Sequence, residues 1–145
     1  MAPPSFLPES RPLNPVSHLL ANVARRPDAT AVFDAGREVS FRELSEVVLG
    51  LVNHFRDDGL GEGEPVAVQL PNRWEYVALE LAIPAAGGVI MPLPLTLGEA
   101  EMGWAMERSG ASRLLTEADL PPLLSAVPPV GPAPAPSLPS DPDRI

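Results

Sequence analysis

Short apolar strand patterns alternate with helix patterns along most of this chain, and the connections between them are short. Strands are predicted at residues 30–33, 65–70, 89–91 and 112–116, and a turn at 34–37 returns the first of them toward residues 38–39. Strands that are joined through helices usually pair in parallel and carry the helices on their faces. The order therefore predicts an α/β fold with a three-layer, doubly wound and mostly parallel sheet flanked by helices.

Four predicted helix starts carry side chains that satisfy the free N–H groups of a first turn. The expected caps are Asn14 followed by Pro15, the capping box Ser40–Glu43, Asn72, and a second capping box Thr96–Glu99. After Ser40, apolar residues recur at helical spacing as far as residue 55, and Gly59 ends the run. In the fourth helix, Met102, Ala105 and Met106 are expected to face inward.

Proline divides the chain into three parts. Five of the 20 prolines lie in residues 1–15 and nine lie in residues 121–142. We therefore predict a flexible Pro-rich N-terminus at residues 1–13, a folded part at 14–120, and a Pro/Ala-rich linker at 121–145.

Composition excludes several classes of function. All ten basic residues are arginine, so a Schiff-base lysine and a P-loop lysine are both absent. A net charge of −9 argues against nucleic acid as a partner, because phosphate binding needs a clustered basic face. No cysteine is present, which excludes thiol nucleophiles and thiolate zinc sites and is compatible with a cytoplasmic protein. The longest mostly apolar stretch, at residues 79–97, is broken by proline and glycine, so no membrane span is expected.

Four segments occur in the order in which one enzyme superfamily carries its first motifs. They are Val39-Ser40-Phe41-Arg42-Glu43-Leu44, the segment from Gly61 to Asn72 that includes Val66-Ala67-Val68 and Pro71-Asn72, Ala86-Gly87-Gly88-Val89-Ile90-Met91-Pro92-Leu93, and Ser109-Gly110-Ala111-Ser112-Arg113-Leu114-Leu115-Thr116. On these motifs, residues 14–119 resemble the N-terminal portion of the adenylate-forming (AMP-binding) superfamily. That superfamily includes acyl-CoA synthetases, firefly luciferase and the adenylation domains of peptide synthetases.

The resemblance implies an incomplete N-terminal subdomain of an ATP-dependent acyl- or aryl-acid ligase. Such an enzyme converts an acid and ATP to an acyl-adenylate and then transfers the acyl group to the thiol of CoA or of a carrier protein. In the family, the phosphate loop and the catalytic lysine come later in the chain, so this segment alone is expected to be inactive and to bind no cofactor. ATP, Mg and CoA (or phosphopantetheine) are implied for the complete enzyme, whose missing remainder is the expected partner, in cis or as a companion chain.

One loop is the candidate for ligand proximity, and it comprises Pro92, Leu93, Pro94, Leu95 and Thr96. It leaves the C-terminal end of a predicted parallel strand, where open sheets bind ligands. The resemblance places it beside the CoA tunnel of acyl-CoA synthetases, although Pro94 stands where an Asp or Asn is common in the family. The alternative is that the prolines only stiffen a crossover between two strands.

Arg73 is a candidate for contact with an anion, because it directly follows the expected helix cap Asn72; an ordinary surface arginine is the alternative. No catalytic residue and no metal ligand are predicted. His18 and His54 each lie in a predicted helix without a second histidine or a convergent carboxylate nearby in the sequence.

Two other classes of function remain open. The chain is alternatively a non-enzymatic partner-binding module or a degenerate remnant of such an enzyme, because an unfinished parallel sheet leaves open strand edges and an uncovered apolar face. An independent nucleotide-binding domain is disfavoured, because the glycine cluster at residues 59–63 follows a helix and precedes a strand.

Overall fold

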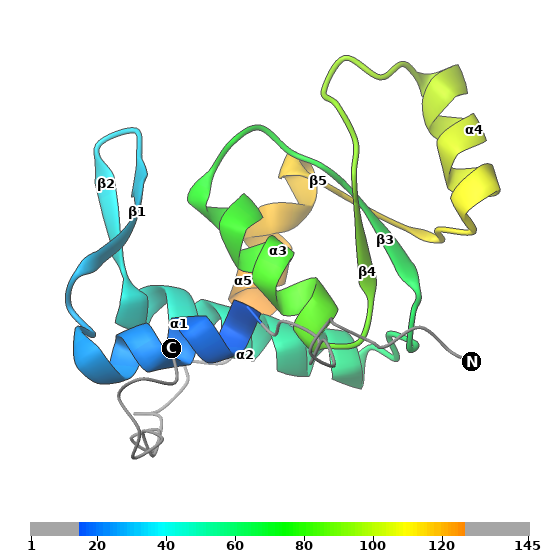
Figure 1. The fold of residues 1–145 in the computed structure, drawn as a ribbon. Helices are drawn as coiled ribbons and strands as arrows, with labels where there is room; N and C mark the ends of the chain where they lie inside the picture. Colours follow the sequence, from blue (N-terminus) through cyan, green and yellow to red (C-terminus); the bar gives the residue numbers. More distant parts are fainter. Residues whose placement is uncertain (1–14, 127–145) are drawn as a thin grey trace, which may run out of the picture.

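The computed structural model describes residues 15–126, and every structural statement below concerns this part of the chain. The elements occur in the order α1 (Pro15–Arg25), β1 (Thr30–Asp34), β2 (Arg37–Ser40), α2 (Phe41–Asp57), β3 (Pro65–Gln69), α3 (Trp74–Ala85), β4 (Val89–Pro92), α4 (Glu99–Ser109), β5 (Arg113–Thr116), the 3-10 helix η1 (Glu117–Asp119) and α5 (Leu120–Ala126) (Figure 1). The predicted cap Asn14, the N-terminal segment 1–13 and residues 127–145 of the predicted linker lie outside the described residues.

The strands form two separate sheets. A three-stranded sheet has the order β4-β3-β5, and both of its pairings are parallel. β1 and β2 form an antiparallel hairpin, in agreement with the predicted turn. The predicted α/β class with a parallel sheet and helices is confirmed, although the first predicted strand belongs to the hairpin and not to the parallel sheet.

β3 lies in the middle of the parallel sheet, because it pairs with β4 on one side and with β5 on the other. Val66 pairs with Ile90 of β4 and with Arg113 of β5. Val66 and Val68 are fully buried and belong to the hydrophobic core. Burying a side chain of this size contributes roughly 1.5–3 kcal/mol, so β3 is a main source of the stability of the sheet.

Helices α2 and α3 supply most of the remaining core. In α2, the predicted capping box is confirmed: the Glu43 N–H donates to Ser40 Oγ at 3.1 Å, and the Ser40 N–H donates to a Glu43 carboxylate oxygen at 3.1 Å. Leu51 of α2 is fully buried, as are Leu79 and Ile83 of α3. The apolar spacing of these helices therefore places one face of each against the core.

Helix α3 begins one residue later than the sequence suggested. Its N-cap is Arg73 and not Asn72, and the Arg73 side chain makes no capping hydrogen bond. The N–H of Trp74 instead donates to the Asp34 carboxylate of the hairpin at 3.0 Å. A contact from a distant segment therefore replaces the local cap that Asn72 was expected to supply.

Helix α4 begins at Glu99, so the predicted capping box Thr96–Glu99 is wrong. Its N-cap is Gly98, whose N–H donates to the Glu101 carboxylate at 3.0 Å. The acidic side chain that closes the first turn therefore lies two residues further along the chain than expected. Met102, Ala105 and Met106, which were expected to face inward, are only half-buried.

Helix α5 changes the expected domain boundary. Residues 121–126, which were assigned to the linker, are helical, and Leu120 and Leu123 are buried in the core. Pro121 and Pro122 fit because the first turn of a helix has no acceptors for its N–H groups, so proline loses no hydrogen bond there.

Candidate ligand-binding site

The carboxyl ends of β3 and β4 lie side by side, and the loops that leave them enclose a groove of about 520 Å³. We call it the loop groove, and its lining consists of Leu70, Pro71, Asn72, Tyr76, Pro92, Leu93, Pro94, Leu95 and Thr96. The whole candidate loop from the sequence therefore lines one groove. This is the edge at which open parallel sheets commonly bind ligands.

Hydrogen bonds hold the loop after β4 against β3. The Leu93 N–H donates to the Val68 carbonyl at 2.9 Å, and the Gln69 side-chain amide donates to the Pro94 carbonyl at 3.0 Å. The Leu97 N–H donates to the same Pro94 carbonyl at 3.1 Å, which closes a turn over residues 94–97. Because Pro92 and Pro94 also fix their own φ angles, one wall of the loop groove has little conformational freedom.

The loop groove is lined without any charged side chain. Its side-chain polar groups are the amide of Asn72 and the hydroxyls of Tyr76 and Thr96. Burial raises the pKa of Tyr76, and the negative charge of Glu80 raises it further, so the phenol stays protonated at neutral pH. The groove therefore suits an uncharged, largely apolar group that makes a few hydrogen bonds, and not a polyphosphate.

Arg73 follows Asn72 in the chain but does not line the loop groove, and it is already paired with two carboxylates. It donates to Glu75 through Nε at 3.2 Å and Nη2 at 3.0 Å, and to Glu117 through Nη1 at 2.6 Å. These bonds, chiefly those to the nearly buried Glu75, raise the pKa of Arg73. An incoming anion would therefore compete with both glutamates for this guanidinium.

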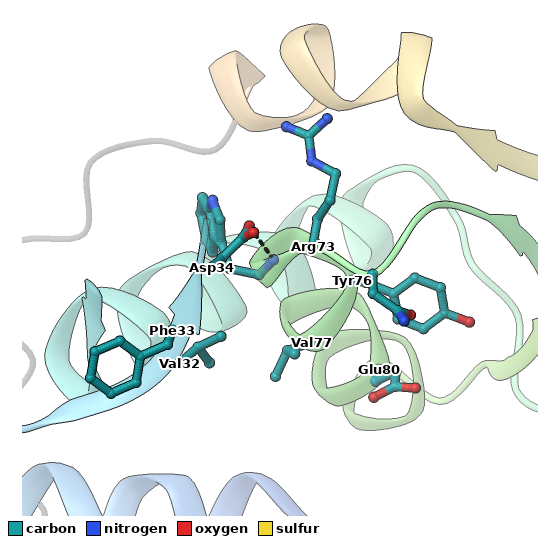
Figure 2. A pocket seen from close by; sticks show the side chains of 9 residues that line it. Val32, Phe33, Asp34, Arg73, Tyr76, Val77 and Glu80 are labelled. Carbon is teal, nitrogen blue, oxygen red and sulfur yellow. Dashed lines mark hydrogen bonds between the residues drawn. The ribbon is translucent and has the colours of Figure 1, made fainter. Parts of the chain in front are cut away.

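A second hollow of about 390 Å³ lies between the hairpin and α3 (Figure 2). We call it the hairpin hollow; Asn72 and Tyr76 line both it and the loop groove. Asp34 bonds to the Trp74 N–H at its wall, as the dashed line in Figure 2 shows. No local sequence pattern pointed to Asp34, because its partner Trp74 lies 40 residues away.

A third hollow, of about 530 Å³, lies on the other side of the loop, toward α4. We call its lining the α4 face, and it consists of Leu93, Pro94, Leu97, Ala100, Glu101, Trp104 and Ala105. Leu93 and Pro94 line both this face and the loop groove. The loop groove therefore shares lining residues with each of the other two hollows.

Other sequence candidates do not join this site. His18 is exposed on α1, and the His54 ring on α2 contacts Phe55 edge-on, with ring centres 5.8 Å apart. Between residues 15 and 126, no group of three or more His, Cys, Asp or Glu side chains is placed to hold a metal ion. Within the same residues, no helix is long and apolar enough to cross a bilayer.

Comparison with known proteins gives concordant matches. The model of a family described as AMP-binding enzyme matches residues 19–142. Enterobactin synthase component F of Escherichia coli O157:H7 is 36% identical over 119 residues, which are 81% of this chain and 9% of that protein. Feruloyl-CoA synthase of an Amycolatopsis species is 39% identical over 89 residues, which are 61% of this chain and 18% of that protein. The chain therefore spans less than a fifth of the length of either relative.

Solved structures show the same fold. The nonribosomal peptide synthetase FmoA3, bound to α-methyl-L-serine-AMP, superposes with a TM-score of 0.67 at 30% identity, covering 72% of this chain and 12% of that one. The N-terminal subdomain of Klebsiella oxytoca NpsA, in complex with anthranilyl-AMSN, gives a TM-score of 0.69 at 22% identity, covering 81% of this chain and 34% of that one.

Proposed function

This chain belongs to the AMP-binding, adenylate-forming enzyme family, and we propose that it is the N-terminal segment of an ATP-dependent acid–thiol ligase. In the proposed reaction, a carboxylate oxygen of an acyl or aryl acid attacks the α-phosphorus of ATP, and pyrophosphate leaves. The thiolate of CoA, or of a carrier protein's phosphopantetheine, then attacks the carbonyl carbon of the acyl-adenylate, and AMP leaves.

The observation that carries this proposal is the family match over residues 19–142. The relatives include a protein named feruloyl-CoA synthase and one named enterobactin synthase component F, at 39% and 36% identity. One relative is named for CoA and a solved neighbour is named a nonribosomal peptide synthetase, so the proposal extends to both CoA and a carrier-protein thiol as the acceptor.

We assign a supporting role to this segment in that reaction. The loop groove has no charged lining, so it does not suit the triphosphate of ATP or a Mg ion, which needs carboxylate ligands. It suits the uncharged part of a ligand, such as the body of the acid or the pantetheine arm of the acceptor. ATP and Mg would then be bound by polypeptide outside this segment, and the segment alone would not catalyse the reaction.

The coding DNA beyond the codon for Ile145 tests this proposal. A downstream open frame that encodes a loop similar to Ser/Thr-Gly-Thr-Thr-Gly-x-Pro-Lys, in frame or in an adjacent frame, would support a ligase built on this scaffold. Absence of such a loop from the next two hundred or so codons would count strongly against it.

One observation favours the alternative of a partner-binding module or enzyme remnant. Large apolar side chains are exposed on the described surface, among them Phe33 at 73% and Trp104 at 64%. A non-enzymatic module would bind its partner without any acid-dependent exchange of pyrophosphate into ATP. That exchange, measured after this chain is combined with its companion polypeptide, separates the two functions.

A further inference from the structure

One arginine side chain joins the start of helix α3 to the end of β5. Arg73 is the N-cap of α3, and its guanidinium donates to both carboxylate oxygens of Glu75 and, through Nη1, to Glu117, which directly follows β5. Figure 2 shows the Arg73 side chain extending toward the segment that follows β5. These bonds are charge-assisted, and the N–H donors of arginine lie in one rigid plane. The bridge therefore fixes the start of α3 relative to the end of β5.

Further contacts hold the segments at both ends of this bridge. The Glu75 side chain is only 8% exposed, so it needs the charge of Arg73 to offset its loss of hydration. On the other side, the Thr116 N–H donates to the Asp119 carboxylate at 2.7 Å, and Leu120 is buried in the core. Arg73 therefore connects two segments that are each anchored independently of it.

The bridge starts at a residue whose neighbours line the loop groove. Asn72 precedes Arg73, the Tyr76 N–H donates to the Arg73 carbonyl at 3.1 Å, and both Asn72 and Tyr76 line the groove. The opposite wall, at residues 92–96, is held to β3 by the Gln69 side chain. The bridge thus holds the wall that carries the Asn72 amide and the Tyr76 hydroxyl.

We propose that Arg73, held by Glu117, is a positioning residue for the substrate group that occupies the loop groove. It acts through Asn72 and Tyr76 and does not touch the substrate itself. This inference rests on the proposed function, and the group concerned is the uncharged, largely apolar part of the acid or of the thiol acceptor. The Glu117 side chain is 63% exposed, and exposed ion pairs contribute little to stability. Its main consequence is therefore the geometry of the wall.

Glu117→Ala in the complete enzyme tests the proposal. Glu117 lies outside the groove, and its removal leaves the bonds between Arg73 and Glu75 in place. We expect the KM of one substrate, the acid or the thiol, to rise about three- to tenfold, a usual range for a residue that acts through its neighbours. The KM for ATP and kcat should not change, because the uncharged groove does not suit a triphosphate.

The substrate whose KM rises identifies the group that occupies the groove. A rise in the KM values of the acid, the thiol and ATP together would indicate a general disturbance of the structure and would overturn the inference. Unchanged KM values for both the acid and the thiol would also overturn it.

A second substitution tests whether Arg73 and Glu117 act together. Arg73→Ala would leave the nearly buried Glu75 without a counter-charge, so Arg73→Lys is used instead. Lysine keeps the charge but lacks the planar fork that bonds both carboxylates. It should raise the same KM, and adding Glu117→Ala should raise that KM no further, because both changes break one contact. Additive effects of the two changes would overturn the inference.

Asp28→Ala is the matched control. Asp28 is also an exposed carboxylate paired with an arginine, Arg42, but neither residue lines the loop groove. All three KM values should stay unchanged in this variant. A rise in the KM of the acid or the thiol equal to that in Glu117→Ala would overturn the inference, because the effect would not be specific to the bridge.

Amide hydrogen exchange in the 145-residue chain gives a readout that does not depend on activity. Exchange at residues 70–76 should be about threefold or more faster in Glu117→Ala than in the unsubstituted chain, because the wall opens more often. Equal exchange would overturn the inference.

Failure of the proposed function has a different signature. If the unsubstituted complete enzyme shows no acid-dependent pyrophosphate exchange, the proposed function fails, and the positioning role fails with it. If that exchange occurs but Glu117→Ala keeps the unsubstituted KM values for the acid and the thiol, only the inference fails.

Discussion

The Asp34 carboxylate accepts a hydrogen bond from the backbone N–H of Trp74 at 3.0 Å, so the β1–β2 hairpin caps helix α3. The guanidinium of Arg37, on the other strand of the hairpin, stacks over the Trp74 ring at 4.9 Å from its centre. The negative charge of Asp34 also lies at the positive end of the α3 dipole. This contact fixes the hairpin relative to the helix that begins beside the loop groove.

Replacing Asp34 by alanine should lower the free energy of unfolding by about 1 kcal/mol, the usual value of a capping side chain. Asp34→Asn should lose less, because its side-chain oxygen still accepts the bond. The midpoint of urea unfolding of the 145-residue chain measures both. Asp28→Ala is the control: Asp28 pairs with Arg42 at 3.3 Å but its side chain is 85% exposed, so we expect little change. A neutral Asp34→Ala variant would contradict the capping role.

Glycine 88 should not tolerate a side chain, whereas Gly103 should. A Cβ at Gly88 would lie 2.9 Å from Leu60 Cδ2 and 3.2 Å from the Glu64 carbonyl, so Gly88→Ala should destabilise the chain by about 1–3 kcal/mol. A Cβ at Gly103, within α4, would meet no atom within 4 Å apart from its chain neighbours and the backbone of its own helix, so Gly103→Ala should stabilise the helix by up to about 1 kcal/mol. Thermal unfolding of both variants checks this, and equal effects would contradict the packing described here.

Local sequence patterns predicted some features of the fold and missed others. The alternation of strands and helices and the Ser40–Glu43 box were predictable, because each signal lies within one element or its cap. The pairing of Arg73 with Glu117 was not predictable, because the two residues lie 44 positions apart in the sequence. The separate hairpin, the central place of β3 and the half-exposed state of α4 also depend on tertiary contacts that no local period encodes.

The candidate site shows the same division. The position of the loop at residues 92–96 followed from its place after a strand, and the structure puts all of it in one groove. The role of Arg73 could not be read from its place near a helix start, because Glu75 and Glu117 already bind its guanidinium. Sequence spacing therefore located the groove, but it did not show that the guanidinium of Arg73 is already paired with carboxylates.

Acid should destabilise this chain partly through Arg113. Hydrogen bonding and the charge of Arg113 lower the pKa of Asp58, and the N–H of Gly61, at 2.9 Å, together with Arg113 lowers that of Glu64. Both carboxylates thus bind protons less readily when folded. Their stabilisation is present above their ordinary pKa values of 3.8 and 4.5, and is lost as pH falls below these values.

Arg113→Ala should therefore reduce the slope of stability against pH on the acid side, although Glu64 keeps its bond from Gly61 and part of the slope remains. Urea unfolding between about pH 3 and 6 measures the slope. Arg42→Ala serves as the comparison, because the exposed pair of Arg42 with Asp28 is largely screened by water. An unchanged slope in Arg113→Ala would contradict this role of Arg113.

In the complete enzyme, Leu95→Arg should raise the KM for the acid or for the thiol acceptor, because it places a charge in a groove lined without one. The unfolding midpoint of the 145-residue chain should not change, since Leu95 is 59% exposed. Val89→Arg is the matched control, because Val89 is 51% exposed and begins β4, at the end opposite the groove. Unchanged KM values for both substrates would indicate that the loop serves only as a crossover.

Acid-dependent exchange of labelled pyrophosphate into ATP tests the central claim most directly. The assay uses this chain together with the polypeptide encoded after it, joined or as a companion chain, and a panel of acyl and aryl acids. We predict exchange that requires one class of acid, Mg and the presence of residues 1–145, with none from the 145-residue chain alone. Exchange that proceeds equally well without this chain, or no exchange with any acid, would contradict the assignment of this segment to an acid–thiol ligase.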